Sequence, residues 1–166
     1  MRGEIRKKER ILSLEDTLAL ITKAEYGVLA TVNPEGQPCT TALNHVYTDG
    51  VFYFHCGLKG ERLDNIALNS QVSFFIVGTA DVIYDQFTTA FSSAAIHGTI
   101  QRVEDPDEKL QALTALVERF SSEVIPEKVK QEFIAAGVHG VTILKLVPEH
   151  VTGKGRLSLK RPCLVY

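Results

Sequence analysis

The dipeptide Asp49–Gly50 constrains the fold of this chain most, because it separates two β-rich segments at hairpin spacing. The segment "CTTALNHVY", residues 39–47, precedes it with only Thr48 between them, and "VFYFH", residues 51–55, follows it directly. An Asp-Gly pair between such segments is typical of a type I′ turn, which needs positive φ at both central positions. The two segments are therefore predicted to form an antiparallel hairpin.

A two-residue turn also fixes which residues face each other across the hairpin. It predicts three cross-strand pairs: Thr48 with Val51, Val46 with Tyr53, and Asn44 with His55. One face then carries the core side chains Leu43, His45, Phe52 and Phe54, and the other presents Thr40, Asn44, Tyr53 and His55. A three-residue loop would shift the pairing and exchange these faces, so the register remains open at this point.

Periodic segments of two kinds alternate along the rest of the chain. Strands are expected at residues 26–33, 71–78, 90–104 and 140–148, and the polar interval 81–89 is expected to be a loop. Helices are expected at residues 14–24 after Ser13, directly after Gly60, from Asp105 as N-cap with Pro106 behind it, and from Pro126 to Gly137. No βαβ rhythm is present, so the pattern predicts the α+β class with an antiparallel barrel of about six strands.

Bulk composition narrows the class of protein. A chain of 166 residues with 45% hydrophobic and 23% charged residues fits one domain, residues 1–166, with its own core. A net charge of −2 argues against a nucleic-acid partner, and the absence of a long apolar run argues against a membrane protein and for a cytoplasmic one. Three scattered cysteines, Cys39, Cys56 and Cys163, indicate reduced thiols, and no spacing predicts a metal site.

The turn after the second hairpin strand concentrates glycines and cations. Within "FYFHCGLKGERLDNI", residues 52–66, Gly57, Lys59, Gly60 and Arg62 stand where a strand gives way to a helix. Such a turn can hold an anion, most often a phosphate, against backbone N–H groups and basic side chains. It can equally be a surface turn with solvated charges.

This segment resembles the FMN-binding split-barrel superfamily related to pyridoxamine 5′-phosphate oxidase, and within it the nitroimidazole-resistance (Nim) branch. That branch has an aromatic strand ending in His, a small pair, a Gly-basic turn and a Leu-Asp helix start. The matching residues here are His55, Cys56, Gly57, Gly60, Arg62, Leu63 and Asp64. The later "FSSAAIHGTIQRVEDPDEKLQALTALVERF" and "PEHVTGKGR" are similar to the family's serine strand with its helix and to its ending.

The resemblance implies a six-stranded, Greek-key split barrel with flanking helices, acting as a homodimer with FMN between the subunits. It implies these cofactor-binding residues: Thr41, Ala42, Leu43, Asn44, His55, Cys56, Lys59, Arg62, Ser92 and Ser93. Arg62 would hold the phosphate, and one of the two serines would reach the phosphate or ribityl chain; Lys59 is expected to add a second cation in compensation for Glu61. Glu61 departs from the pattern, because many relatives carry a second basic residue there.

The predicted function is an FMN-dependent oxidoreductase in which the flavin carries the chemistry and no side chain acts as nucleophile. Electrons would pass from a reduced nicotinamide or another donor to a small-molecule substrate, a nitroaromatic one by the Nim resemblance. His55 is a possible contact to flavin or substrate. A non-catalytic flavin- or haem-binding dimer and an apo structural dimer are the alternatives. Cys56 has a simpler interpretation as a small buried residue, and His45 as a satisfied core residue.

Overall fold

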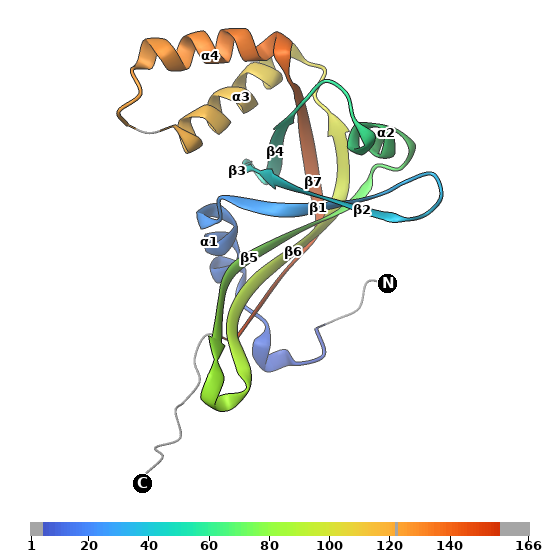
Figure 1. Ribbon diagram of the computed structural model, residues 1–166, viewed down its shortest axis with the longest axis vertical. Coiled ribbons are helices and arrows are strands. Elements are labelled where there is room, and N and C mark those ends of the chain that lie inside the picture. The colour runs from blue at the N-terminus through green and yellow to red at the C-terminus, as the bar shows by residue number, and fades with distance from the viewer. Residues whose placement is uncertain (1–4, 122, 157–166) are drawn as a thin grey trace.

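The computed structural model describes residues 5–121 and 123–156, and it contains one antiparallel sheet that curls into a barrel (Figure 1). The sheet has seven strands in the order β2-β1-β5-β6-β7-β4-β3. The strands are β1 (Tyr26–Val32), β2 (Pro38–Asn44), β3 (Val46–Thr48), β4 (Val51–Cys56), β5 (Gln71–Ile83), β6 (Thr88–Arg102) and β7 (Thr142–Arg156). The predicted α+β class and antiparallel barrel are confirmed.

The strand count differs from six because His45 divides the predicted strand 39–47. β2 pairs with β1 while β3 pairs with β4, so the two halves lie at opposite edges of the strand order. This division brings the two edges of the sheet together and closes the barrel.

The hairpin register is confirmed near the turn and wrong beyond it. The turn has φ 50° at Asp49 and φ 81° at Gly50, as a type I′ turn requires. The pairs Thr48–Val51 and Val46–Tyr53 form as predicted. The predicted pair of Asn44 with His55 does not form, because Asn44 has already crossed to β1, where it pairs with Tyr26.

The predicted loop at residues 81–89 is also wrong, because most of it is strand. β5 continues to Ile83 and β6 starts at Thr88, with only the 3₁₀ turn η2 (Tyr84–Gln86) between them. The resulting hairpin extends well beyond the barrel (Figure 1). The outer part of β5 is exposed on both faces, so the alternation of polar and apolar residues that marks a half-buried strand is missing there. β7 likewise runs on to Arg156, past the predicted end at residue 148, and pairs along β6.

The helices begin where their caps predicted. α1 (Leu14–Lys23) follows Ser13, whose hydroxyl accepts a hydrogen bond from the Asp16 N–H, and η1 (Lys8–Arg10) precedes it. α2 (Glu61–Leu68) follows Gly60, and α3 (Pro106–Phe120) is capped by Asp105. α4 (Glu127–Gly140) ends three residues later than the predicted stop at Gly137. None of the helices in the described part of the chain is long and apolar enough to cross a membrane.

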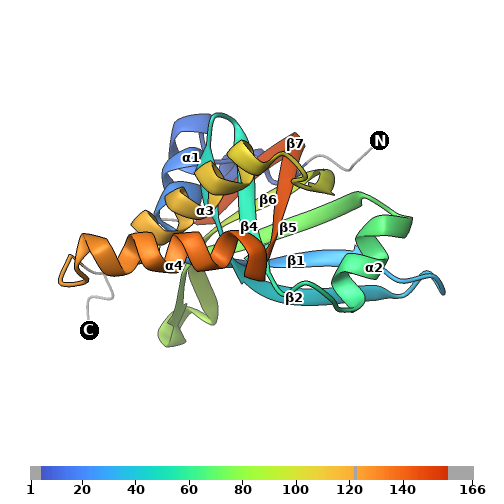
Figure 2. The same cartoon turned by 90° about the horizontal axis from the view of Figure 1, so that it is seen from above.

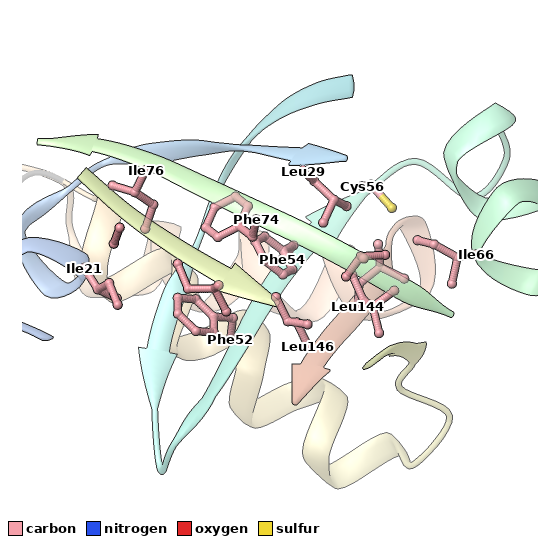
Figure 3. Close-up of a cluster of buried hydrophobic side chains, with 14 of the residues drawn as sticks. Ile21, Leu29, Phe52, Phe54, Cys56, Ile66, Phe74, Ile76, Leu144 and Leu146 are labelled. Atoms are coloured by element: carbon pink, nitrogen blue, oxygen red, sulfur yellow. The ribbon is translucent and has the colours of Figure 1, made fainter. Parts of the chain in front are cut away.

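Three phenylalanines dominate the barrel core (Figure 3). Phe52, Phe54 and Phe74 are fully buried, and the ring of Phe74 meets the other two edge-on at centroid distances of 5.8 and 4.9 Å. His45 lies against Phe52 and Phe74, and its Nε2 is 3.0 Å from the carbonyl oxygen of Ile21. Burial lowers the pKa of His45 from 6.5 to about 4. The interpretation of His45 as a core residue is confirmed, but only its Nε2 is satisfied, because its Nδ1 has no hydrogen-bond partner among the described residues.

A second, smaller core lies where α3 packs against β3, β4 and β7, and α4 packs on α3. The two helices run side by side at one flank of the barrel (Figures 1 and 2). The side chains of Tyr53 and Lys145 each bond to Glu108 Oε1 at 2.7 Å, and this fixes α3 to the sheet. The hydrogen bond from Lys145 lowers the pKa of Glu108.

Candidate functional site

The Gly-basic turn before α2 leaves open space for a ligand. Gly60 has φ 140°, and a Cβ built there would meet no atom within 4 Å. Lys59 is exposed and Arg62 is half-buried. The Nε of Arg62 is shielded from solvent without a hydrogen-bond partner among the described residues. A buried donor without a partner is unusual, so an acceptor from outside the described chain would stabilise it.

Glu61, the departure from the family pattern, is engaged by a neighbouring strand. Its Oε1 accepts a hydrogen bond from the thiol of Cys39 on β2 at 3.3 Å. This bond to the carboxylate raises the pKa of Cys39 above 9.0 and keeps the thiol protonated. Cys39 is a free cysteine, as predicted, and Cys163 lies outside the described residues.

The predicted β2 residues alternate between the two faces of their strand. Ala42 and Asn44 are exposed, whereas Thr41 and Leu43 are half-buried and Leu43 packs on the barrel core. Asn44 Nδ2 donates a hydrogen bond to the carbonyl oxygen of Glu25 at 2.9 Å, which fixes this side chain at the end of the strand. The outer face of β2 is therefore the one that can meet a ligand.

At the end of β4, His55 and Cys56 point in opposite directions. His55 is exposed, and Cys56 is buried among the core side chains. The interpretation of Cys56 as a small buried residue is confirmed. Within residues 5–121 and 123–156, no group of three or more His, Cys, Asp or Glu side chains is arranged to hold a metal ion.

A groove of about 380 Å³ brings Asn44 and His55 together, although the two residues do not pair. Its other lining residues come from α3, α4 and their flanks: Leu113, Leu116, Val117, Phe120, Ser121, Ile125, Val129, Lys130, Phe133 and Val141. The sequence predicted helices here but no site. The available signal was an excess of apolar residues, since Phe120, Val129 and Phe133 remain exposed after the helices have packed.

Ser92 and Ser93 lie apart from the Gly-basic turn. The Ser92 hydroxyl is 3.0 Å from the N–H of Thr79 at a β-bulge, and the Ser93 hydroxyl donates to the carbonyl oxygen of Lys154 at 3.3 Å. Gln71, which follows α2, pairs with Thr99 of β6. Thr99 is six residues from Ser93, or about 20 Å along an extended strand. Within one chain, these serines therefore lie far from the end of the barrel where α2 packs.

Comparison with known proteins places this geometry in a family. The model of the pyridoxamine 5′-phosphate oxidase family matches residues 13–155. The chain belongs to this family. The match spans the barrel, the Gly-basic turn and the α3–α4 pair, so the predicted resemblance is confirmed. No curated protein matches the chain.

Solved structures confirm the split-barrel fold of this family member. A conserved hypothetical protein from Mycobacterium tuberculosis has a TM-score of 0.77 at 18% identity, over 94% of this chain and 97% of that one. A proposed 5-nitroimidazole antibiotic resistance protein from Bacteroides thetaiotaomicron has a TM-score of 0.72 at 20% identity, over 87% and 85%. An FAD and haem binding protein from Mycobacterium smegmatis has a TM-score of 0.70 at 18% identity, over 88% and 72%.

Proposed function

We propose that this member of the pyridoxamine 5′-phosphate oxidase family binds FMN and transfers electrons through it to a small acceptor. The observation that carries the proposal is the buried, unpartnered Nε of Arg62 beside the open turn at Gly60. A phosphate would supply the missing acceptor and a charge-assisted bond. Family membership and the flavin-binding relatives support the proposal that this phosphate is part of a flavin nucleotide. One of these relatives is an FAD-binding protein from Mesorhizobium loti.

The residues present fit such a cofactor. Arg62 and the exposed Lys59 would hold the phosphate, and the open glycine turn would let it approach the backbone. The outer face of β2, with Ala42 and Asn44, would lie along the flavin. Bound FMN would supply reversible two-electron redox chemistry. His55, exposed at the groove, would orient the acceptor by a hydrogen bond, and a nitro group is an acceptor of suitable chemistry.

The protein is further proposed to act as a homodimer through the outer face of β1 and β5. Val28 on β1 pairs with Phe75 on β5, and their exposed fractions are 37% and 43%. Val77 on the same face is 56% exposed, and Ala42 pairs with Val28 on the other side. A contiguous apolar row across several strands is typical of an interface between subunits. A partner subunit would also place its own copies of Ser92 and Ser93 near the flavin, whereas the serines of the same chain lie too far from its Gly-basic turn.

The phosphate contact is tested by comparing FMN with riboflavin in isothermal titration calorimetry. Arg62→Ala should weaken FMN binding about ten- to a hundredfold and leave riboflavin binding nearly unchanged. Glu61→Lys should strengthen FMN binding, and this gain should shrink with added salt. Arg102→Ala, which removes an exposed arginine on β6, is the matched control. An FMN-to-riboflavin ratio that Arg62→Ala leaves unchanged, in a folded variant, would exclude the phosphate contact.

The visible spectrum of the purified protein distinguishes the alternative ligands. We expect the absorption of an oxidised flavin, either on purification or after mixing with FMN. A haem spectrum instead would support the non-catalytic haem-binding alternative.

The proposed interface is tested by light scattering on Phe75→Glu, with Ala135→Glu on the exposed side of α4 as control. Phe75→Glu should give monomers with weakened FMN binding, because the interface and the flavin site would be lost together. A wild-type monomer that binds FMN tightly would contradict the dimer.

A further inference from the structure

The groove between α3 and α4 has the composition of a small-molecule site. Eight of its twelve lining residues are apolar, and its four polar residues are Asn44, His55, Ser121 and Lys130. A volume of about 380 Å³ lies in the range of ligand pockets, roughly 300–1,000 Å³, and near its lower end. The helices that form its walls lie beside the barrel, with α4 outermost (Figure 2). The groove can therefore accommodate a ligand with one or two rings or a branched aliphatic group of similar size.

The charge of the groove has one sign. Among the described lining residues Lys130 is the only lysine or arginine, and none of them carries a carboxylate. The nearby acidic residues of α4 are engaged elsewhere: Glu127 accepts a hydrogen bond from Gln131 at 2.6 Å, and Glu132 is 3.9 Å from Lys128. In the described ranges no ion pair forms with Lys130, which is half-buried. An anionic group would complement this surface.

Ser121 gives a second, independent indication of a ligand. Its hydroxyl oxygen is shielded from solvent and has no hydrogen-bond partner among the residues that the structure describes. The residue lines the groove at the end of α3. A buried hydroxyl without a partner costs stability, and a ligand with an oxygen acceptor would offset that cost.

We infer that this groove binds an apolar organic anion, one or two rings or an aliphatic body of similar size with a single anionic group. Lys130 pairs with the anion, and Phe120 and Phe133 pack against the apolar body. His55 and Asn44 form the end of the groove nearest the proposed flavin face. The role of this anion as the substrate rests on the proposed function, whereas its binding does not.

Two probes of the same shape test the inference, 2-naphthoate and the uncharged 2-naphthylmethanol, titrated into the full-length protein by calorimetry. We expect one naphthoate per chain, bound at least about tenfold more tightly than the alcohol. Lys130→Met should abolish this preference and leave binding of the alcohol unchanged. Lys128→Met, on the same helix but 86% exposed at its side chain, should preserve the preference.

A second pair of variants tests the location. Val129→Trp should fill the groove and weaken both probes about tenfold or more, whereas Ala135→Trp on the same helix, outside the groove, should weaken neither. Melting curves followed by circular dichroism check that each variant folds. If Val129→Trp does not fold, the two lysine variants still decide.

Equal affinity of the wild type for both probes, or full naphthoate binding by Lys130→Met, would overturn the inference. Displacement of naphthoate by FMN would overturn it as well, because the groove would then be the binding site of the flavin itself. Naphthoate binding by a protein that does not bind FMN would remove the proposed function and keep this site. FMN binding without naphthoate binding would remove only this site.

Discussion

The barrel core and the α3–α4 groove are both apolar and rich in phenylalanine, yet only the first is closed. Phe52, Phe54 and Phe74 are fully buried, whereas Phe120 and Phe133 in the groove are 40% and 63% exposed. The core is enclosed because the strands of the barrel surround it, whereas the groove lies at the flank of the barrel and is lined mainly by residues of α3 and α4. Apolar side chains thus stabilise the fold in one region and remain available to a ligand in the other.

The largest effect expected from this comparison is on stability. Phe54→Ala should lower the free energy of unfolding by about 3–5 kcal/mol, because it opens a cavity in a closed core. Phe133→Ala should change it by about 0.5 kcal/mol or less, since the ring is already largely in water. Urea unfolding of both variants measures the difference. Equal losses would mean that the groove is part of the core.

The second prediction concerns the imidazole that the closed core keeps neutral. The folded-state pKa of His45 is about 4 and its unfolded value is 6.5, so the unfolded state binds more protons between these values. The stabilisation is therefore complete above pH 6.5 and is lost as the pH falls to 4, about 3 kcal/mol in all. Urea midpoints across this range should show the loss in wild type and not in His45→Gln. Parallel profiles of the two proteins would contradict a buried neutral His45.

The smallest effect is expected where α3 is attached to the sheet. Glu108→Gln should cost about 0.5–1 kcal/mol, because its two hydrogen-bonding partners are only partly shielded from water. Since Lys145 lowers the pKa of Glu108, this contribution is present above the unfolded pKa of 4.5 and is lost as the pH falls through the folded value. Glu118→Gln, an exposed carboxylate on the same helix, is the control. Thermal unfolding should show a larger cost at pH 7 than at pH 3.

Local signals in the sequence predicted local features well. Ser13 and Asp105 cap the helices that follow them, and Asp49–Gly50 forms its turn, because each feature depends on residues a few positions apart. The same signals failed where distant strands compete for a partner. Asn44 pairs with β1 instead of continuing the hairpin, and residues 81–83 extend β5 because β6 is available to pair with them.

The candidate site also combines local features, which the sequence predicted, with long-range features, which it did not. The Gly-basic turn, with Lys59 and Arg62, is contiguous in the chain, so its resemblance to a family could be recognised from the sequence alone. The separation of Ser93 from α2 depends on strand register, which no local pattern records. The contact of Cys39 with Glu61 joins a strand and a helix 22 residues apart.

The sequence by itself determined the turns, the caps, the strand and helix periodicities and the family, because each of these is a property of neighbouring residues. Only the tertiary structure decided that His45 divides a strand between two edges of the sheet, and that Asn44 and His55 line the same groove without pairing. The physical reason is that closure of the barrel and packing of α3 with α4 depend on which distant surfaces fit each other. Such a fit is a property of the whole chain and leaves no period in any short segment of it.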